Sequence, residues 1–505
     1  MTSTLDLIGQ STEELPTEKK ESSDSTIAQK LKFLRDVITV EPLVTSYLVA
    51  AVICLPAFLT LELEKACRAN MGLNETVCQA IRDSDHDNYT AVNKNITILL
   101  NGVHSWQAPC QNFAPLILVL FIGSYSDRRQ IRKPFMILPL VGELFAVVGC
   151  ILSVIFMKEW PVEVQGFLQA VVPSFFGGPT MLIMAIFSYV ADSSTVEMRT
   201  IRVAIVQTIL NVAIPIGQFL SGILFIHLGY IGVLLIAAAL YLFGICYGIF
   251  FIKEVRQPKV QKDKSLLKDI FDPTNAIDTF KVLWKEDDKK DLPLLRVILL
   301  MFLIVTGITN VNLTTLFLYL QNVFHWTGPD FTYYITTNTV VHLIGIVLFV
   351  PLFTKVFHLS DITILSFTFL DKIATTIIMG LARSNIALYI GCFVSIITNI
   401  TIVALRSMAT KAVSEEDLGK AQSLFGIFEA IGIATLTPLI NMVFTATLDD
   451  FPAAFIFIET IVYIGCLLLL ALSFYLRKYV KTILKNPADT TENKTKVEDV
   501  QTTRI

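Results

Sequence analysis

The sequence predicts an all-α integral membrane protein with twelve transmembrane helices, arranged as two six-helix halves in parallel repeat, and with both termini in the cytosol. Composition, the lengths of the apolar runs and the one-sided distribution of positive charge lead to this prediction. Of the 505 residues, 53% are hydrophobic and only 16% are charged, whereas a soluble domain has about 25% charged residues. This apolar excess is too large for one soluble core and indicates a protein that lies in a bilayer.

The apolar residues form twelve runs, and each is close to the roughly 20 residues that a helix needs to cross a bilayer. The runs lie at 43–63, 110–126, 134–157, 164–190, 202–227, 231–252, 293–319, 331–356, 362–382, 384–405, 420–444 and 452–476. Residues 1–40 are polar and lack the apolar core of a secretory signal. We therefore expect them to be a disordered cytosolic tail, with 479–505 as a second cytosolic tail.

Positive charge predicts the orientation, because Lys and Arg concentrate in cytoplasmic loops. With the N-terminus inside, 33 of the 40 basic residues lie on the cytosolic side, six lie outside, and Lys372 lies within a run. Residues 253–292 contain ten of them and form a cytosolic linker between the halves 41–252 and 293–478. Contact with anionic lipid is sufficient to explain the linker charge. The net charge of −3 does not indicate a nucleic-acid partner.

Residues 64–109 form the only long outer loop, and its motifs agree with an extracytosolic position. It contains three N-glycosylation sequons, which begin at Asn74, Asn88 and Asn95. It also contains Cys67 and Cys78, with Cys110 at the membrane edge, whereas the other five cysteines lie within runs. In an oxidising compartment a Cys67–Cys78 disulfide is the preferred pairing, although Cys110 leaves an odd partner and keeps other pairings open.

An internal repeat relates the two halves. The segment Arg202–Gly217 opens the fifth run and the segment Lys420–Gly432 opens the eleventh, 218 residues later, and both follow a polar inner loop. Two six-helix halves in parallel repeat, joined by a cytosolic linker, describe the major facilitator architecture, in which the substrate site lies between the halves near the midplane.

A second motif lies between the second and third runs. The segment Gly123-Ser-Tyr-Ser-Asp-Arg-Arg-Gln-Ile-Arg-Lys133 resembles the major facilitator loop motif G-x-x-x-D-R-x-G-R-K. Gly123 permits close helix packing, and a carboxylate at Asp127 can hold basic groups or a helix N-terminus. We interpret the motif as an inner latch formed by Gly123, Asp127, Arg128 and Arg132. The alternative is an ordinary positive loop, which explains the arginines but not the spacing of Gly and Asp.

The chain also resembles one branch of that superfamily, the proton-coupled folate transporter group, solute carrier family 46. The matching stretches are Val40-Glu-Pro42, Ser126-Asp-Arg128, Arg132-Lys-Pro134, Tyr189-Val-Ala-Asp192, Arg202-Val-Ala204, Leu405-Arg-Ser-Met408 and Leu418-Gly-Lys420. The resemblance implies proton-driven uptake of organic anions such as folates, or export of peptidoglycan fragments and drug catabolites from endosomes and lysosomes. Gln207 replaces the family's coupling glutamate, and the seventh run has no histidine, so the chain departs from the family's proton route.

Ionisable groups inside the runs are candidates for carrying protons, because burying them in a membrane is costly. Glu429 stands at the repeat position equivalent to Asn211 and is the first choice for a proton carrier. A structural hydrogen bond to a neighbouring helix is an equal alternative. His342, with Asn338 one turn earlier, is the second choice because imidazole titrates near neutral pH. A structural histidine, hydrogen-bonded to a threonine, is the alternative there.

Polar residues from both halves are candidates for the substrate site. Gln207 and Asn211 share one face of the fifth run, and Asn310 lies in the seventh. Such residues can line a cavity or hold helices together. Arg406 is the candidate anchor for a substrate carboxylate, through a bidentate contact. Its alternative is an arginine that only follows the rule for positive inner loops.

The expected function is therefore that of a secondary active transporter for a small organic anion, working by alternating access and coupled to protons. No metal-ligand spacing, phosphate-binding loop or nucleophile constellation is present, so we expect neither an enzyme nor a cofactor or metal. A proton-independent facilitator and a non-transporting receptor or adaptor remain alternatives. The plasma membrane is the expected location, and the endosomal or lysosomal membrane is the alternative.

Overall fold

A computed structural model describes residues 39–85, 87–129, 131–194, 196–254, 292–412 and 418–485. All regular elements in these ranges are helices, which confirms the predicted all-α class. Nearly all of the predicted tail 1–40, most of the linker 253–292 and residues 486–505 of the second tail lie outside them.

The N-terminal half contains five long helical segments. Two of them are broken into shorter pieces, and the last one bends. The elements are α3 (Glu41–Ile53), α4 (Leu55–Lys65), η1 (Ala66–Asn70), α5 (Glu75–Arg82), η2 (Asp87–Tyr89), α6 (Thr90–Arg129), α7 (Lys133–Ile155), α8 (Val162–Gly166), η3 (Phe167–Val171), α9 (Val172–Phe175), α10 (Gly178–Ser193) and α11 (Val196–Phe250).

The C-terminal half contains α14 (Leu292–Phe324), α15 (Gly328–Pro351), η4 (Leu352–Val356), α16 (Asp361–Leu381), α17 (Asn385–Val394), η5 (Ser395–Ile397), α18 (Ile400–Ala412), α19 (Leu418–Thr447) and α20 (Ala454–Lys485). Serine is the N-cap residue of two of these helices, α16 and α17. Ser360 Oγ accepts from the backbone N–H of Thr363, and Ser384 Oγ accepts from that of Ala387. Such caps satisfy N–H groups that a first helical turn cannot pair internally.

Ten helical segments within the described ranges are long and apolar enough to span a membrane. One of them, Ile205–Phe250, contains two helices, because the backbone leaves the helical region at Gly229 (φ 62°, ψ −165°). Glycine tolerates this conformation at no steric cost. The 40-residue α6 is not among the ten. The number twelve therefore stays a prediction.

The main difference from the sequence prediction concerns the outer loop 64–109. Residues 90–109, expected to be loop, instead extend the second membrane helix to the 40 residues of α6. The side chains of Asn93, Thr97 and Asn101 are buried on one face of this extension. A helix that packs through a polar stripe has low hydropathy. For this reason the apolar run at 110–126 predicted only the second part of α6.

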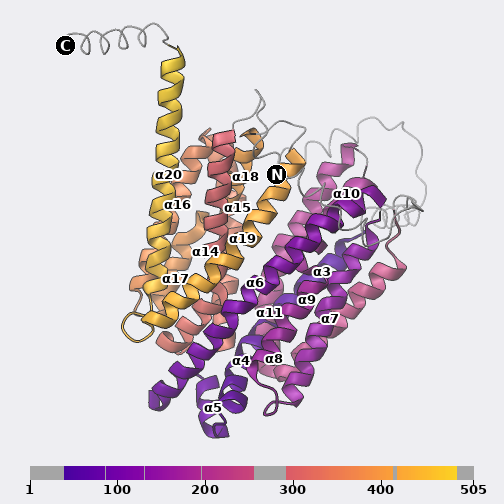
Figure 1. Ribbon diagram of the computed structural model, residues 1–505, viewed down its shortest axis with the longest axis vertical. Coiled ribbons are helices and arrows are strands. Elements are labelled where there is room, and N and C mark those ends of the chain that lie inside the picture. Colours follow the sequence, from indigo (N-terminus) through magenta and orange to yellow (C-terminus); the bar gives the residue numbers. More distant parts are fainter. Residues whose placement is uncertain are drawn as a thin grey trace, which may run out of the picture.

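The two halves lie side by side, with α6 against α19 and α11 against α15 (Figure 1). The short helix α5 lies at one end of the bundle, and the described ends of the chain lie at the other (Figure 1). We name these the outer and the inner end, following the orientation predicted from charge. Within the C-terminal half, Gly307 and Gly432 bring α14 and α19 together: a Cβ on Gly307 would lie 2.6 Å from the carbonyl oxygen of Gly432.

Candidate functional site

Arg406 and Glu429, predicted separately from the sequence, form an ion pair. Arg406 Nη2 on α18 lies 3.8 Å from Glu429 Oε2 on α19, and the two side chains are 46% and 37% exposed. The Arg406 guanidinium also lies 5.6 Å and 5.8 Å from the ring centres of Phe302 and Phe425. The aromatic faces attract the cation. The candidate anchor for an anion and the candidate proton carrier thus belong to one site.

The exposure of this pair indicates which way it faces. Phe302 and Phe425 beneath it are buried in the core of the C-terminal half, so the charged groups lie on the surface of that half. Charged groups within membrane helices are costly when they face lipid and instead face the bundle interior or a water-filled space. This favours a position on the side of the C-terminal half that faces the N-terminal half.

Gln207 and Asn211 are exposed on α11, one turn apart. Asn211 lies nine residues after Arg202, and Glu429 lies nine residues after Lys420, which is roughly 14 Å along each helix at 1.5 Å per residue. Their similar depth agrees with the internal repeat. The side chain of Asn310 lies outside the described residues.

Asn338 and His342 meet the same partner across two helices. His342 Nε2 lies 3.0 Å from Ser395 Oγ, and Asn338 Oδ1 lies 3.3 Å from that oxygen. Ser395 is buried in η5, between α17 and α18. These contacts tie α15 to the segment formed by α17, η5 and α18, and they favour the structural interpretation of His342, with serine in place of the expected threonine.

At the inner end, only part of the predicted latch can be placed, because the surroundings of Gly123 and the side chains of Asp127 and Arg128 lie outside the described residues. Arg132 is described. Its Nε donates to Asp192 Oδ2 at 3.0 Å, and its Nη1 donates to Ser126 Oγ at 2.8 Å. The Glu254 carboxylate accepts from the backbone N–H groups of Arg132 and Lys133, at the start of α7. These contacts hold helices of one half together, and the latch stays a proposal.

The outer end contains an interface between the halves that the sequence analysis did not predict. Asn93 Nδ2 donates to Asn322 Oδ1 at 2.7 Å, and Asn322 Nδ2 donates to Thr97 Oγ1 at 2.8 Å. Asn101 Nδ2 donates to the backbone oxygen of Asn441 and to Thr445 Oγ1. We name this set the outer seam, and it includes the exposed ion pair between Lys94 and Asp449. The four-residue spacing of Asn93, Thr97 and Asn101 was the available signal for a polar helix face.

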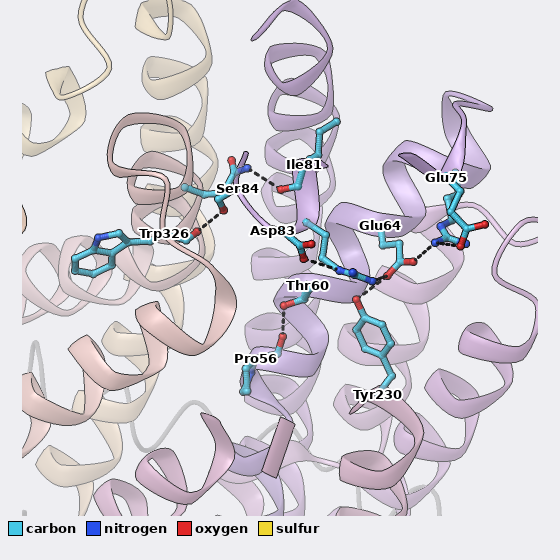
Figure 2. Close-up of polar contacts among 12 residues, drawn as sticks. Pro56, Thr60, Glu64, Glu75, Ile81, Asp83, Ser84, Tyr230 and Trp326 are labelled. Atoms are coloured by element: carbon cyan, nitrogen blue, oxygen red, sulfur yellow. Dashed lines mark hydrogen bonds and ion pairs between the residues drawn. The ribbon is translucent and has the colours of Figure 1, made fainter. Parts of the chain in front are cut away.

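The short helix α5 and its following turn reinforce this end (Figure 2). Ser84 Oγ donates to the backbone oxygen of Trp326 at 2.9 Å in the C-terminal half, whereas Arg82 lies 3.9 Å from Glu64 of the N-terminal half. Glu64 also accepts from Tyr230 Oη at 2.7 Å and pairs with Arg68. The α5 region therefore contacts both halves at the outer end, and together with the outer seam it joins them there.

The structure joins Cys67 and Cys78 in a disulfide, the pairing preferred from the sequence, with the Cα atoms 5.6 Å apart. Cys110 is a half-buried free thiol. The side chains of Asn74, Asn88 and Asn95 are all exposed, and their glycosylation stays a prediction.

Comparison with known proteins identifies the family. The profile of the Major Facilitator Superfamily matches residues 99–370. The chain belongs to the major facilitator superfamily. This membership makes it a multi-pass membrane transporter rather than an enzyme, in agreement with the expectation from the sequence.

The chain is also similar to two proteins of solute carrier family 46. One is the lysosomal proton-coupled steroid conjugate and bile acid symporter SLC46A3 of Gallus gallus, with 24% identity over 83% of this chain and 90% of the relative. The other is the probable peptidoglycan muropeptide transporter SLC46 of Drosophila melanogaster, with 21% identity over 80% of this chain and 79% of the relative. These two matches agree with the resemblance seen in the motifs.

Solved structures of the superfamily share the fold. The human organic anion transporter MFSD10 superposes with a TM-score of 0.56 at 15% identity, over 86% of this chain and 99% of that protein. An auto-inhibited peptide transporter of the POT family gives a TM-score of 0.57 at 12% identity, over 89% of this chain and 97% of that protein. At these identities the likeness shows the major facilitator fold alone.

Proposed function

We propose that this protein is a secondary active transporter of a small organic anion, that it works by alternating access, and that it couples uptake to protons. The observation that carries the proposal is the Arg406–Glu429 pair, because the two groups compete. When Glu429 is ionised, its carboxylate forms an ion pair with the Arg406 guanidinium and competes with a substrate anion for it. When Glu429 takes up a proton, Arg406 can bind the carboxylate or sulfate of a substrate instead. One proton and one anion then enter the site together.

The compounds that the two relatives are named for transporting support this proposal. Steroid conjugates and bile acids are amphipathic anions, and muropeptides also carry carboxylates. In this chain the rings of Phe302 and Phe425 lie against the Arg406 guanidinium, and an apolar substrate body next to its anionic group would suit such surroundings. Because one relative is lysosomal, the endosomal or lysosomal membrane is a supported alternative to the plasma membrane as the location of this protein.

Flux measurements in proteoliposomes test the proposal directly. We expect uptake of at least one solute from a panel of folate, an antifolate, a muropeptide and a sulfated steroid, with faster uptake at an outer pH of 5.5 than at 7.4. Uptake that is independent of pH for every transported solute would contradict proton symport and indicate a facilitator. Binding without counterflow would indicate a receptor or adaptor.

Glu429→Gln tests the proton carrier. The amide matches the shape of the protonated acid and cannot ionise, so Arg406 stays available at every pH. We expect uptake to lose its pH dependence and to remain near the level that the unmodified protein shows at acidic pH. Glu159→Gln, at an exposed outer position, is the matched control and should leave the pH profile unchanged. A normal pH profile in Glu429→Gln would show that another group carries the proton.

A further inference from the structure

We propose that Glu62 and His104 form a second proton-binding site, at the outer end of the N-terminal half, and that proton binding there stabilises the closed outer seam. Glu62 lies on α4 and His104 on α6. His104 Nε2 is 2.8 Å from Glu62 Oε2, and both side chains are only 3% exposed. Neither residue belongs to the Arg406–Glu429 pair or to the sites expected from the sequence. The proposal rests on alternating access as part of the proposed function.

The hydrogen bonds show where a proton can bind. His104 Nε2 and Glu62 Oε2 lie within hydrogen-bond distance; when Glu62 is an ionised carboxylate it can only accept, and Nε2 of the imidazole then carries the hydrogen. Nδ1 of His104 is then the ring nitrogen with a free lone pair, and within the described part of the chain this buried atom has no hydrogen-bond partner. One further proton on Nδ1 converts a neutral imidazole beside a carboxylate into an imidazolium–carboxylate pair. The net charge of the buried pair changes from −1 to zero.

The neighbouring ionisable groups are engaged elsewhere. Lys65 on α4 is buried, but its Nζ donates to the backbone oxygens of Phe156 and Trp160. Glu64 turns toward Arg68, Arg82 and Tyr230. On α7, Cys150 is a buried thiol, and Glu143 accepts from Tyr47 Oη.

The remaining neighbours are neutral. Gln107 lies one turn from His104 on α6, and Gln165 is buried on α8. On α19, across the seam, Asn441 and Thr445 are the groups that contact Asn101. Within this set His104 is the ionisable group in direct contact with the Glu62 carboxylate, so its protonation can balance the Glu62 charge at that contact.

Both helices that carry the pair also contact the C-terminal half at the outer end. His104 lies three residues after Asn101, on the same side of α6, and Asn101 bonds to α19 in the outer seam. On α4, Thr60 lies so close to Gly328 of α15 that a Cβ on the glycine would be 2.5 Å from the Thr60 hydroxyl. Opening of the outer end must separate both helices from that half.

The direction of the effect follows from the charge that the closed seam buries. Burying an uncompensated carboxylate away from water has a high free-energy cost. Burying a hydrogen-bonded ion pair of zero net charge costs less. A ligand shifts a conformational equilibrium toward the state that it stabilises more. Protonation of His104 removes the buried net charge, so an acidic outer solution shifts the equilibrium toward the closed outer end. The transporter would thus close after the proton has bound.

Distance measurements without substrate test the site. Spin labels are attached at Lys158→Cys and Asp450→Cys, which are exposed outer positions in opposite halves. Cys110 and Cys246 are replaced by Ala so that they are not labelled. The distance between the two labels, measured by double electron–electron resonance, reports opening of the outer end. We expect the closed-to-open ratio to rise roughly 5-fold or more between pH 7.5 and 5.5, a size usual for coupling between two sites. His104→Gln and Glu62→Gln should each lose most of this dependence.

The two variants should also move the equilibrium in opposite directions at pH 7.5. His104→Gln keeps the hydrogen bond but leaves the buried charge at −1, and this favours the open end. Glu62→Gln removes the charge, and this favours the closed end. A purely structural pair would respond to both substitutions in the same direction. His227→Gln, which removes an exposed imidazole next to the bend of α11 at Gly229, is the control and should behave like the unmodified protein.

Three outcomes would overturn the proposal. They are an unchanged pH shift in His104→Gln, shifts of the same direction in both variants, and no pH shift in the unmodified protein. Uptake by the same proteins separates this site from the proposed function. If uptake depends on pH while the distances do not, the proton-binding site is wrong and symport stands. If the distances depend on pH through His104 while uptake does not, the site stands and symport is wrong.

Discussion

Arg406→Ala is expected to reduce uptake of the organic anion by roughly 10- to 100-fold at acidic outer pH. A hydrogen bond to a charged group contributes about 1.5–3 kcal/mol, and each 1.4 kcal/mol corresponds to about tenfold in binding. The proposed mechanism places the substrate anion on the guanidinium that Glu429 otherwise occupies. Without the guanidinium, no cation of this pair remains for the anion. Initial rates over a range of substrate concentrations, at equal amounts of protein in the membrane, measure the effect.

Two further variants make the result specific. Arg406→Lys keeps a positive charge but loses the planar pair of donors, so we expect an intermediate loss. Arg383→Ala removes an exposed arginine in the turn before α17 and should transport normally. Substrate uptake by Arg406→Ala at the rate of the unmodified protein would show that the anion is bound elsewhere, and it would leave Arg406 as an inner-end arginine only.

The sequence was sufficient to predict the all-α membrane class because membrane crossing imposes one strong rule, a long apolar run, that a spanning helix meets independently of its neighbours. The pairing of Arg406 with Glu429 could not be predicted in the same way. The two residues lie on separate helices, and whether they face each other depends on how α18 and α19 rotate and pack around Phe302 and Phe425. Hydropathy contains no information on that rotation.

The outer end was mispredicted for a related physical reason. Asn93, Thr97 and Asn101 are polar, and polar residues between apolar runs are typical of loops, yet here they are buried against polar partners of the other half. His104 was assigned to the same loop, and Glu62 lay at the predicted end of the first run. Both residues are buried because α6 begins at Thr90 and packs its first part within the bundle.

Locking the outer seam is expected to stop transport almost completely. Lys94 and Asp449 face each other across the two halves, and their side chains are 39% and 64% exposed. An exposed ion pair of this kind contributes only about 0–1 kcal/mol, so replacing both residues by cysteine should leave the fold intact. A bifunctional methanethiosulfonate reagent that bridges the two new cysteines would hold the outer end closed, and alternating access requires that end to open in every cycle.

The cross-link experiment needs controls for the native disulfide and for the substitutions themselves. We expect Lys94→Cys with Asp449→Cys to lose more than nine tenths of its uptake after treatment with the bifunctional reagent and to recover it after reduction. Each single variant should keep its uptake after the same treatment. The unmodified protein, treated with the same reductant, shows how much of any change comes from Cys67–Cys78. Full uptake by the cross-linked protein, with the cross-link verified by mass spectrometry, would mean that the halves do not separate along this seam. The substrate would then have to enter by a route that leaves α6 and α19 in contact.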